Sequence, residues 1–125
     1  AEYPASEQAK LSQEKIRDCE SRLAEHNFVI AVQYHNQRAY RASLDRLNEI
    51  MSTYPDFKRM GELYFYMGSC NFFLKKYDEA RPFFTKVVTD YANEKVARKA
   101  QKILKQMEGL KTEPAPEPGK KPVKK

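Results

Sequence analysis

The chain repeats itself at an offset of 37 residues. The two copies align similar side chains, namely Tyr40 with Tyr77, Leu47 with Phe84, Ile50 with Val87 and Tyr54 with Tyr91. The small residues Ala31 and Gly68 fall into the same register. A period of about 34 residues, with small residues where two helices touch, is typical of stacked helical hairpins. Because such a stack presents a surface to a partner, we expect this chain to act by recognition.

The repeat predicts an all-α fold of tetratricopeptide-like hairpins wound into a right-handed superhelix. No glycine or proline interrupts residues 6–37, so the first helix should be long. Residues 109–125 are rich in Pro, Lys and Glu and lack aromatic residues, which favours a disordered tail. We expect one repeat domain over residues 1–108, with helices at 6–37, 40–54, 57–74, 78–91 and 94–108.

Apolar residues recur at helical spacing in each expected helix. In the first helix they form a narrow stripe of Ala9, Ile16, Cys19, Leu23, Ile30 and Tyr34. The second helix places Ser43, Leu44, Leu47, Ile50, Met51 and Tyr54 on one face, and the fourth places Ala80, Phe83, Phe84, Val87, Val88 and Tyr91. Asp56 and Asn93 are expected to cap the third and fifth helices. Gly68 should let a neighbouring helix approach closely.

The net charge of +6 is unevenly distributed. Residues 95–105 hold five basic residues and no acidic one, and five more lysines follow from Lys111. A basic surface suits lipid headgroups, nucleic acid or acidic protein faces. The alternative is a solvated helix face with a solubilising tail. We favour this alternative over nucleic-acid binding, because no nucleic-acid-binding fold signature accompanies the charge.

The residue pattern offers no catalytic, metal-binding or cofactor-binding motif. His26 and His35 lie about 13 Å apart along one helix axis, too far for a shared metal ion. Cys19 and Cys70 could form a disulfide, but buried free thiols are the favoured interpretation. The chain has no apolar run of membrane-spanning length and no signal peptide, and it begins without methionine. We therefore expect a processed or excised piece of a non-enzymatic protein.

Two groups of side chains are candidates for partner binding. The first is aromatic and lies on the third helix: Phe65, Tyr66, Phe72 and Phe73. These rings either fill the core, which we favour, or line a groove that grips a partner segment. The second group, Arg38, Arg41, Arg46 and Glu49, lies on or beside the second helix. These arginines are either solvated surface charges or ion-pairing anchors.

Several segments resemble BamD, the lipoprotein family of the outer-membrane β-barrel assembly machinery. These are Tyr3-Pro-Ala-Ser, the run from Ile16 to Glu-His26, and the run from Ala39-Tyr-Arg-Ala through Tyr54-Pro-Asp56. The resemblance covers about residues 2–107 and corresponds to the C-terminal half of that family. It implies tetratricopeptide hairpins joined by one long helix.

The resemblance also implies a periplasmic scaffold at the outer membrane of a Gram-negative bacterium. The partners would be BamA periplasmic domains and other lipoproteins of the complex, with no nucleic acid and no cofactor. Membrane association would come through a lipidated N-terminus absent from this sequence, or through partners. The family's interface arginine falls on Arg46, although Asn48 and Glu49 depart from the expected pattern. The rival interpretations are a TolA-binding repeat protein of the cell envelope and a generic peptide-binding repeat adaptor.

Overall fold

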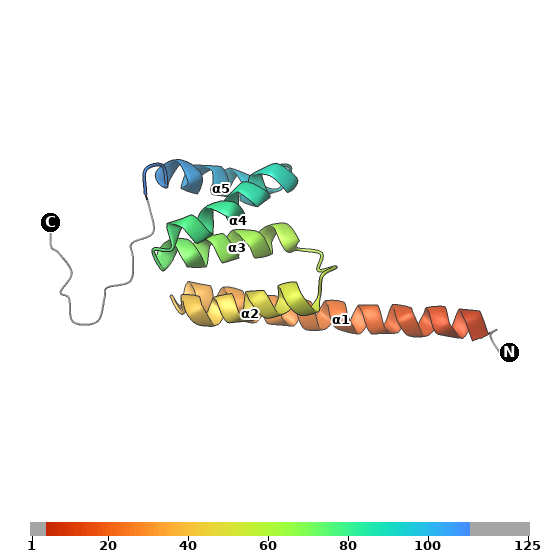
Figure 1. Cartoon of the computed structure of the whole chain (residues 1–125). Helices are drawn as coiled ribbons and strands as arrows, with labels where there is room; N and C mark the ends of the chain where they lie inside the picture. Colours follow the sequence, from red (N-terminus) through yellow and green to blue (C-terminus); the bar gives the residue numbers. More distant parts are fainter. Residues whose placement is uncertain (1–4, 111–125) are drawn as a thin grey trace.

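The computed structural model describes residues 5–110 of the chain, and the fold of this part is all-α, as predicted (Figure 1). It contains five helices and no strand: α1 (Ala5–Asn36), α2 (Tyr40–Thr53), α3 (Met60–Phe73), α4 (Tyr77–Asp90) and α5 (Lys95–Gln106). None of these helices is both long enough and apolar enough to cross a membrane. The tail predicted for residues 109–125 lies outside the described part from residue 111 onward.

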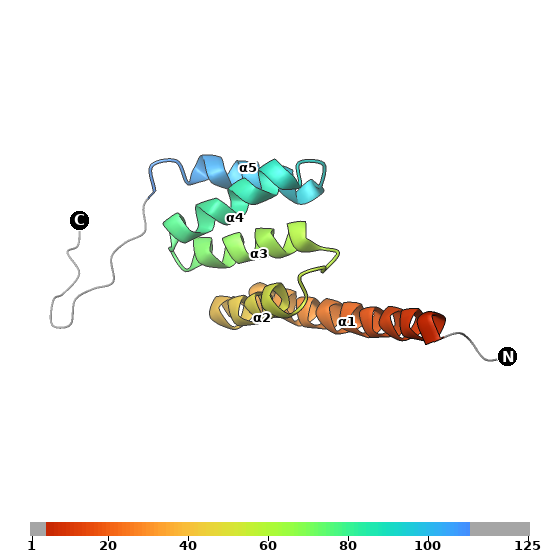
Figure 2. The same ribbon diagram turned by 45° about the vertical axis from the view of Figure 1, so that its right-hand side comes forward.

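The helices form two hairpins, α1–α2 and α3–α4, and α5 closes the stack (Figures 1 and 2). α2 packs on α3, and α5 packs on α4 and α3. The N-terminal part of α1 extends well past the other helices in both views. Residues 5–23 of that extension are all exposed.

The turn inside each hairpin has the same backbone geometry, 37 residues apart in sequence. Arg38 and Lys75 adopt left-handed conformations, with φ of 65° and 64°. After α1, the amide of Ala39 donates to the carbonyl of Tyr34 at 2.8 Å, and after α3, Lys76 donates to Asn71 at 2.8 Å. A left-handed residue with this six-to-one hydrogen bond is a Schellman helix end. The repeat seen in the sequence therefore extends to the backbone.

Two hydrophobic clusters share α3 between them. The first joins α1, α2 and α3 through buried side chains that include Phe28, Leu47, Ile50, Leu63 and Met67. The second consists of buried side chains at α4 and α5, and Tyr64, Phe65 and Phe72 of α3 pack against it; its buried members are Ala80, Phe84, Val87, Ala97, Ala100 and Met107. Burial on both sides explains why the sequence of α3 is apolar around most of its circumference.

Small residues bring the two helices of each hairpin together. In the first hairpin, Ser43 Oγ donates a buried hydrogen bond of 2.7 Å to the carbonyl oxygen of Ala31. In the second hairpin, a Cβ atom on Gly68 would lie 2.9 Å from the nearest ring atom of Phe84. The close approach predicted at Gly68 is therefore present, and its contact is the Phe84 ring.

The apolar stripe predicted as the packing face of α1 is wrong over the N-terminal two thirds of the helix. Ile16 and Leu23 are 57% and 53% exposed, and Ala9 and Cys19 are also exposed. The buried residues of α1 are Ala24, Phe28 and Ala31. These lie three or four residues apart on a different face, where two alanines leave room for the Phe28 ring to reach α2 and α3.

The third and fifth helices begin later than predicted. α3 begins at Met60 rather than residue 57, with Arg59 and not Asp56 at the N-cap position. Phe57 instead lies in the α2–α3 connection, where its buried ring packs 5.4 Å from that of Phe28. α5 runs over Lys95–Gln106 rather than 94–108, and its N-cap position is Glu94 rather than Asn93.

Candidate functional site

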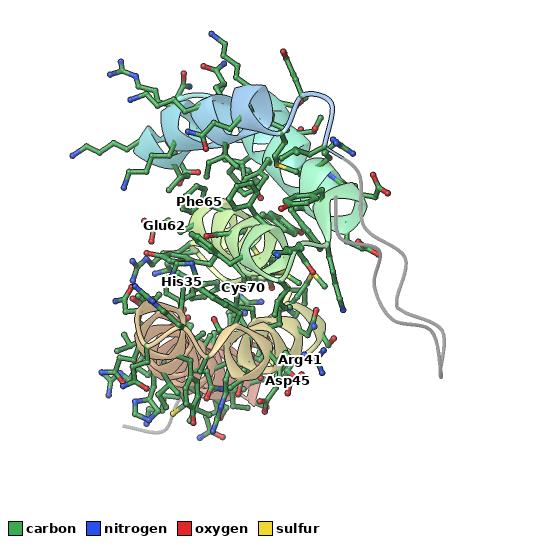
Figure 3. All side chains as sticks on the ribbon, turned by 90° about the vertical axis from the view of Figure 1, so that its left-hand side faces the viewer. His35, Arg41, Asp45, Glu62, Phe65 and Cys70 are labelled. Carbon is green, nitrogen blue, oxygen red and sulfur yellow. The ribbon has the colours of Figure 1, made fainter. Side chains whose placement is uncertain are left out.

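Some members of the two predicted groups of partner-binding residues lie on different flanks of the stack. Figure 3 shows Phe65 and Glu62 of α3 on one flank and Arg41 and Asp45 of α2 on the other. The structure therefore separates Phe65 from Arg41, whereas Phe73 stacks on Tyr40, the residue that precedes Arg41.

The arginine group surrounds the outer surface of the α1–α2 hairpin. Arg41 and Glu49 are exposed on α2, and Arg38 is exposed at the turn that precedes it. Arg46 is half-buried and turned toward α1, where its Nη1 donates to Asn27 Oδ1 at 3.4 Å. This hydrogen bond is long, so it restrains the guanidinium only weakly.

Three other arginines of the chain are paired with carboxylates. Arg22 lies 3.1 Å from Asp18, Arg81 lies 2.6 Å from Asp78, and Arg59 contacts both Glu25 and Glu62. In the arginine group, neither Arg38 nor Arg41 nor Arg46 forms such an ion pair within residues 5–110. These three guanidinium groups retain their capacity to bind a carboxylate of another molecule.

Three of the four aromatic residues pack against the hydrophobic clusters. Tyr66 packs against Phe28, with ring centres 5.7 Å apart, and Phe65 packs against Phe84 at 5.8 Å. Phe72 packs against Tyr77 at 5.6 Å. All three are half-buried. They thus hold neighbouring helices together.

Phe73 differs from the rest of the aromatic group because 51% of its surface is exposed. Its ring stacks on Tyr40 at 4.9 Å with an interplanar angle of 11°. Tyr40 opens α2, and Phe73 closes α3. Phe73 is therefore the member of the aromatic group that is most open to solvent or a partner.

His35 lies among the rings of Tyr40, Tyr66 and Phe73, and the sequence analysis did not identify this position. Its imidazole packs edge-on against Tyr40, Tyr66 and Phe73 at 5.4, 5.1 and 5.9 Å. Nε2 lies 2.8 Å from Ser69 Oγ. Burial lowers the pKa of His35, and the Asn36 side chain offsets part of this shift. The repeat held a signal for this role, because its register aligns His35 with Phe72.

Arg59 is a second residue that the sequence analysis missed. Its guanidinium contacts Glu25 of α1 and Glu62 of α3, and it lies 4.6 Å from the centre of the Phe28 ring. No sequence pattern indicated this arrangement, because it depends on the path of the α2–α3 connection.

An open groove of about 540 Å³ lies between the exposed part of α1 and the α2–α3 connection. Its lining includes Arg17, Asp18, Tyr54, Phe57 and Lys58. None of the predicted partner-binding residues lines this groove. Among residues 5–110, no group of three His, Cys, Asp or Glu side chains is placed to hold a metal ion.

The two cysteines are free and occupy contrasting environments. Cys19 is exposed on α1, so the prediction that both thiols are buried is wrong for this residue. Cys70 is buried between the hairpins, and burial raises the pKa of its thiol to about 11. The exposure of Cys19 has the same cause as that of Leu23, since both lie in the part of α1 that extends past the other helices.

Comparison with known proteins gives one result for this chain. A family model described as YfiO, outer membrane lipoprotein, matches residues 1–82. The match spans α1, α2 and α3 and ends within α4. Searches of curated proteins and of solved structures found no significant match.

Proposed function

The chain belongs to the YfiO family of outer membrane lipoproteins, and on this premise we propose that it is a non-enzymatic scaffold of the β-barrel assembly complex. In this role it binds the periplasmic domains of BamA on the periplasmic side of the outer membrane. It also contacts other lipoproteins of the complex and assists the insertion of barrel proteins. The family match over residues 1–82 is the observation that carries the proposal.

The outer surface of the α1–α2 hairpin is the proposed docking site. It lies inside the matched segment and carries Arg38, Arg41 and Arg46 without ion-pair partners in the described part of the chain. Arg46 is the proposed central contact. Its half-buried stem limits its motion, so less conformational entropy is lost when the guanidinium binds a carboxylate. Glu49 is exposed one turn along the helix and adds a contact of opposite charge.

Capture of the chain by purified BamA periplasmic domains tests this proposal. We expect the wild-type chain to bind and Arg46→Glu to lose at least tenfold in affinity, because truncating or reversing a central charged contact costs about 2 kcal/mol or more. Lys10→Glu is the matched control, since it makes the same change of charge at an exposed position of α1. The control should bind like the wild type.

Two outcomes would contradict the proposal. Equal affinities for wild type and Arg46→Glu would remove Arg46 from the interface. No capture of the wild-type chain would favour a TolA-binding protein or a generic peptide-binding adaptor. The exposed Phe73–Tyr40 stack is the observation that supports the adaptor, because exposed aromatic rings anchor peptide ligands. In that case Phe73→Ala, and not Arg46→Glu, would reduce binding of the peptide.

A further inference from the structure

The outward side of α5 is a continuous basic surface, which we call the basic face. It consists of five residues that are all exposed: Lys95, Arg98, Lys99, Lys102 and Lys105. At 3.6 residues per turn, these positions fall within about one third of the helix circumference. The opposite side of the helix carries the buried residues Ala97 and Ala100. In Figure 3, nitrogen-tipped side chains project from α5 away from the rest of the stack.

Packing at both ends of α5 keeps the basic face turned outward. Ala97 and Ala100 lie in the second hydrophobic cluster, and Met107 follows them into it just after the helix ends. Arg81 of α4 donates from Nη2 to the carbonyl oxygen of Met107 at 3.1 Å. Rotation of α5 about its axis would break these contacts. The orientation of the basic face is therefore a fixed property of the fold.

The charges of the basic face repel one another. Lys95 and Lys99 are four residues apart, as are Arg98 and Lys102, and like charges at this spacing destabilise a helix. No acidic residue occurs within α5, and none of the five basic residues forms an ion pair within residues 5–110. The positive end of the helix dipole lies beside Lys95 and adds to the repulsion. An external anionic surface would offset this repulsion at all five basic residues together.

We propose that the basic face docks on a bilayer that contains anionic phospholipids. Four of its five residues are lysines, and lysine is depleted in protein interfaces but typical of segments that bind anionic membranes. The basic face has no aromatic residue, whereas interface energy between proteins usually depends on aromatic anchors. Membership of an outer membrane lipoprotein family places a bilayer within reach. This site is independent of the Arg46 surface.

Sedimentation of the full chain with lipid vesicles tests the proposal. The vesicles contain either phosphatidylcholine alone or phosphatidylcholine with about one third phosphatidylglycerol. We expect binding only to the second kind, weakening as salt is added. The triple variant Lys95→Gln, Lys99→Gln, Lys102→Gln should bind at least tenfold more weakly, since each lysine near an anionic surface contributes about fivefold at low salt.

Two controls separate the basic face from other positive charges. The triple variant Lys10→Gln, Lys15→Gln, Arg17→Gln removes the same charge from the exposed part of α1 and should bind like the wild type. A variant with Gln at Lys120, Lys121, Lys124 and Lys125 removes charge from the end of the sequence and should retain most of the binding. Circular dichroism should show the same helix content in all variants. Arg46→Glu should leave vesicle binding unchanged.

Three results would overturn the proposal. The first is equal vesicle binding by the α5 triple variant and the wild type. The second is loss of binding only in the variant at residues 120–125, which would assign the affinity to that segment. The third is binding of a DNA oligonucleotide by the basic face without binding to anionic vesicles, which would identify a nucleic-acid site instead.

Discussion

The guanidinium carbon of Arg59 lies 4.6 Å from the centre of the Phe28 ring, and this contact links the start of α3 to the C-terminal third of α1. The same guanidinium contacts Glu25 and Glu62, one carboxylate from each of these helices. Phe28 is 1% exposed, so Arg59 covers the edge of the first hydrophobic cluster. Arg59 thus joins α1 to the second hairpin through ion pairs and a cation–π contact.

Arg59→Ala should lower the free energy of unfolding by about 1 kcal/mol. The cation–π contact and two partly exposed ion pairs contribute amounts of this size, and solvent screens the ion pairs. Urea denaturation of both proteins measures the difference. Arg22→Ala is the control, because Arg22 and Asp18 form a pair that is 80% and 61% exposed. A loss of stability in the control as large as in Arg59→Ala would contradict the assignment.

Lys75→Gly should stabilise the chain by about 0.5–1 kcal/mol. Lys75 has φ of 64°, and a residue with a Cβ atom is strained in this conformation whereas glycine is not. Lys76→Gly is the matched control, since Lys76 has φ of −95° and glycine there only adds freedom to the unfolded chain. Thermal unfolding should therefore move in opposite directions for the two variants. A shift in the same direction for both would refute the role of the turn.

Gly68→Ala should destabilise the chain by about 1 kcal/mol, although alanine is the better helix former. The added methyl group would lie 2.9–3.1 Å from three ring atoms of Phe84, and overpacking of this kind costs about 1–3 kcal/mol. The gain in helix propensity is about 1 kcal/mol and offsets only part of that cost. Combining Gly68→Ala with Phe84→Leu should cost less than the sum of the single changes. Additive costs would show that the two sites do not touch.

His35 should make stability depend on pH in the mildly acidic range. Burial lowers its folded-state pKa below the ordinary value of 6.5, so the unfolded chain takes up a proton at a higher pH than the folded chain. The contribution of this group is fully present above pH 6.5 and is lost as pH falls from there toward the lowered pKa. In His35→Gln the dependence in this window should be weaker. Denaturation curves between about pH 5 and 8 provide the comparison.

The two thiols should differ strongly in reactivity. At pH 8, an alkylating reagent should modify Cys19 rapidly, because this residue is exposed, and should reach Cys70 only after unfolding. The pKa of about 11 at Cys70 also predicts that stability declines as pH rises from about 9 toward 11, where the unfolded thiol ionises first. Mass spectrometry of the labelled protein, with Cys19→Ser as control, checks the first expectation. Rapid double labelling of the folded chain would contradict it.

Much of this fold was predictable because the repeat encodes it locally. The alignment of Ala31 with Gly68 marked where the helices of each hairpin meet, and both contacts are present. The buried faces of α2 and α4 also follow their apolar spacing. The candidate site was harder to predict from the sequence. Phe65, Tyr66 and Phe72 have the same side-chain chemistry whether they pack inside or bind a partner. Burial alone separates them from Phe73.

The sequence by itself determined the helices and their pairing into hairpins, since these depend on residues within one repeat. The tertiary structure alone decided which face of α1 is buried, and it placed His35 among three aromatic rings and Arg59 over Phe28. The reason is physical. The buried face of α1 depends on where α2 and α3 pack against it, and residues 5–23 stay exposed because that part of α1 extends past the other helices.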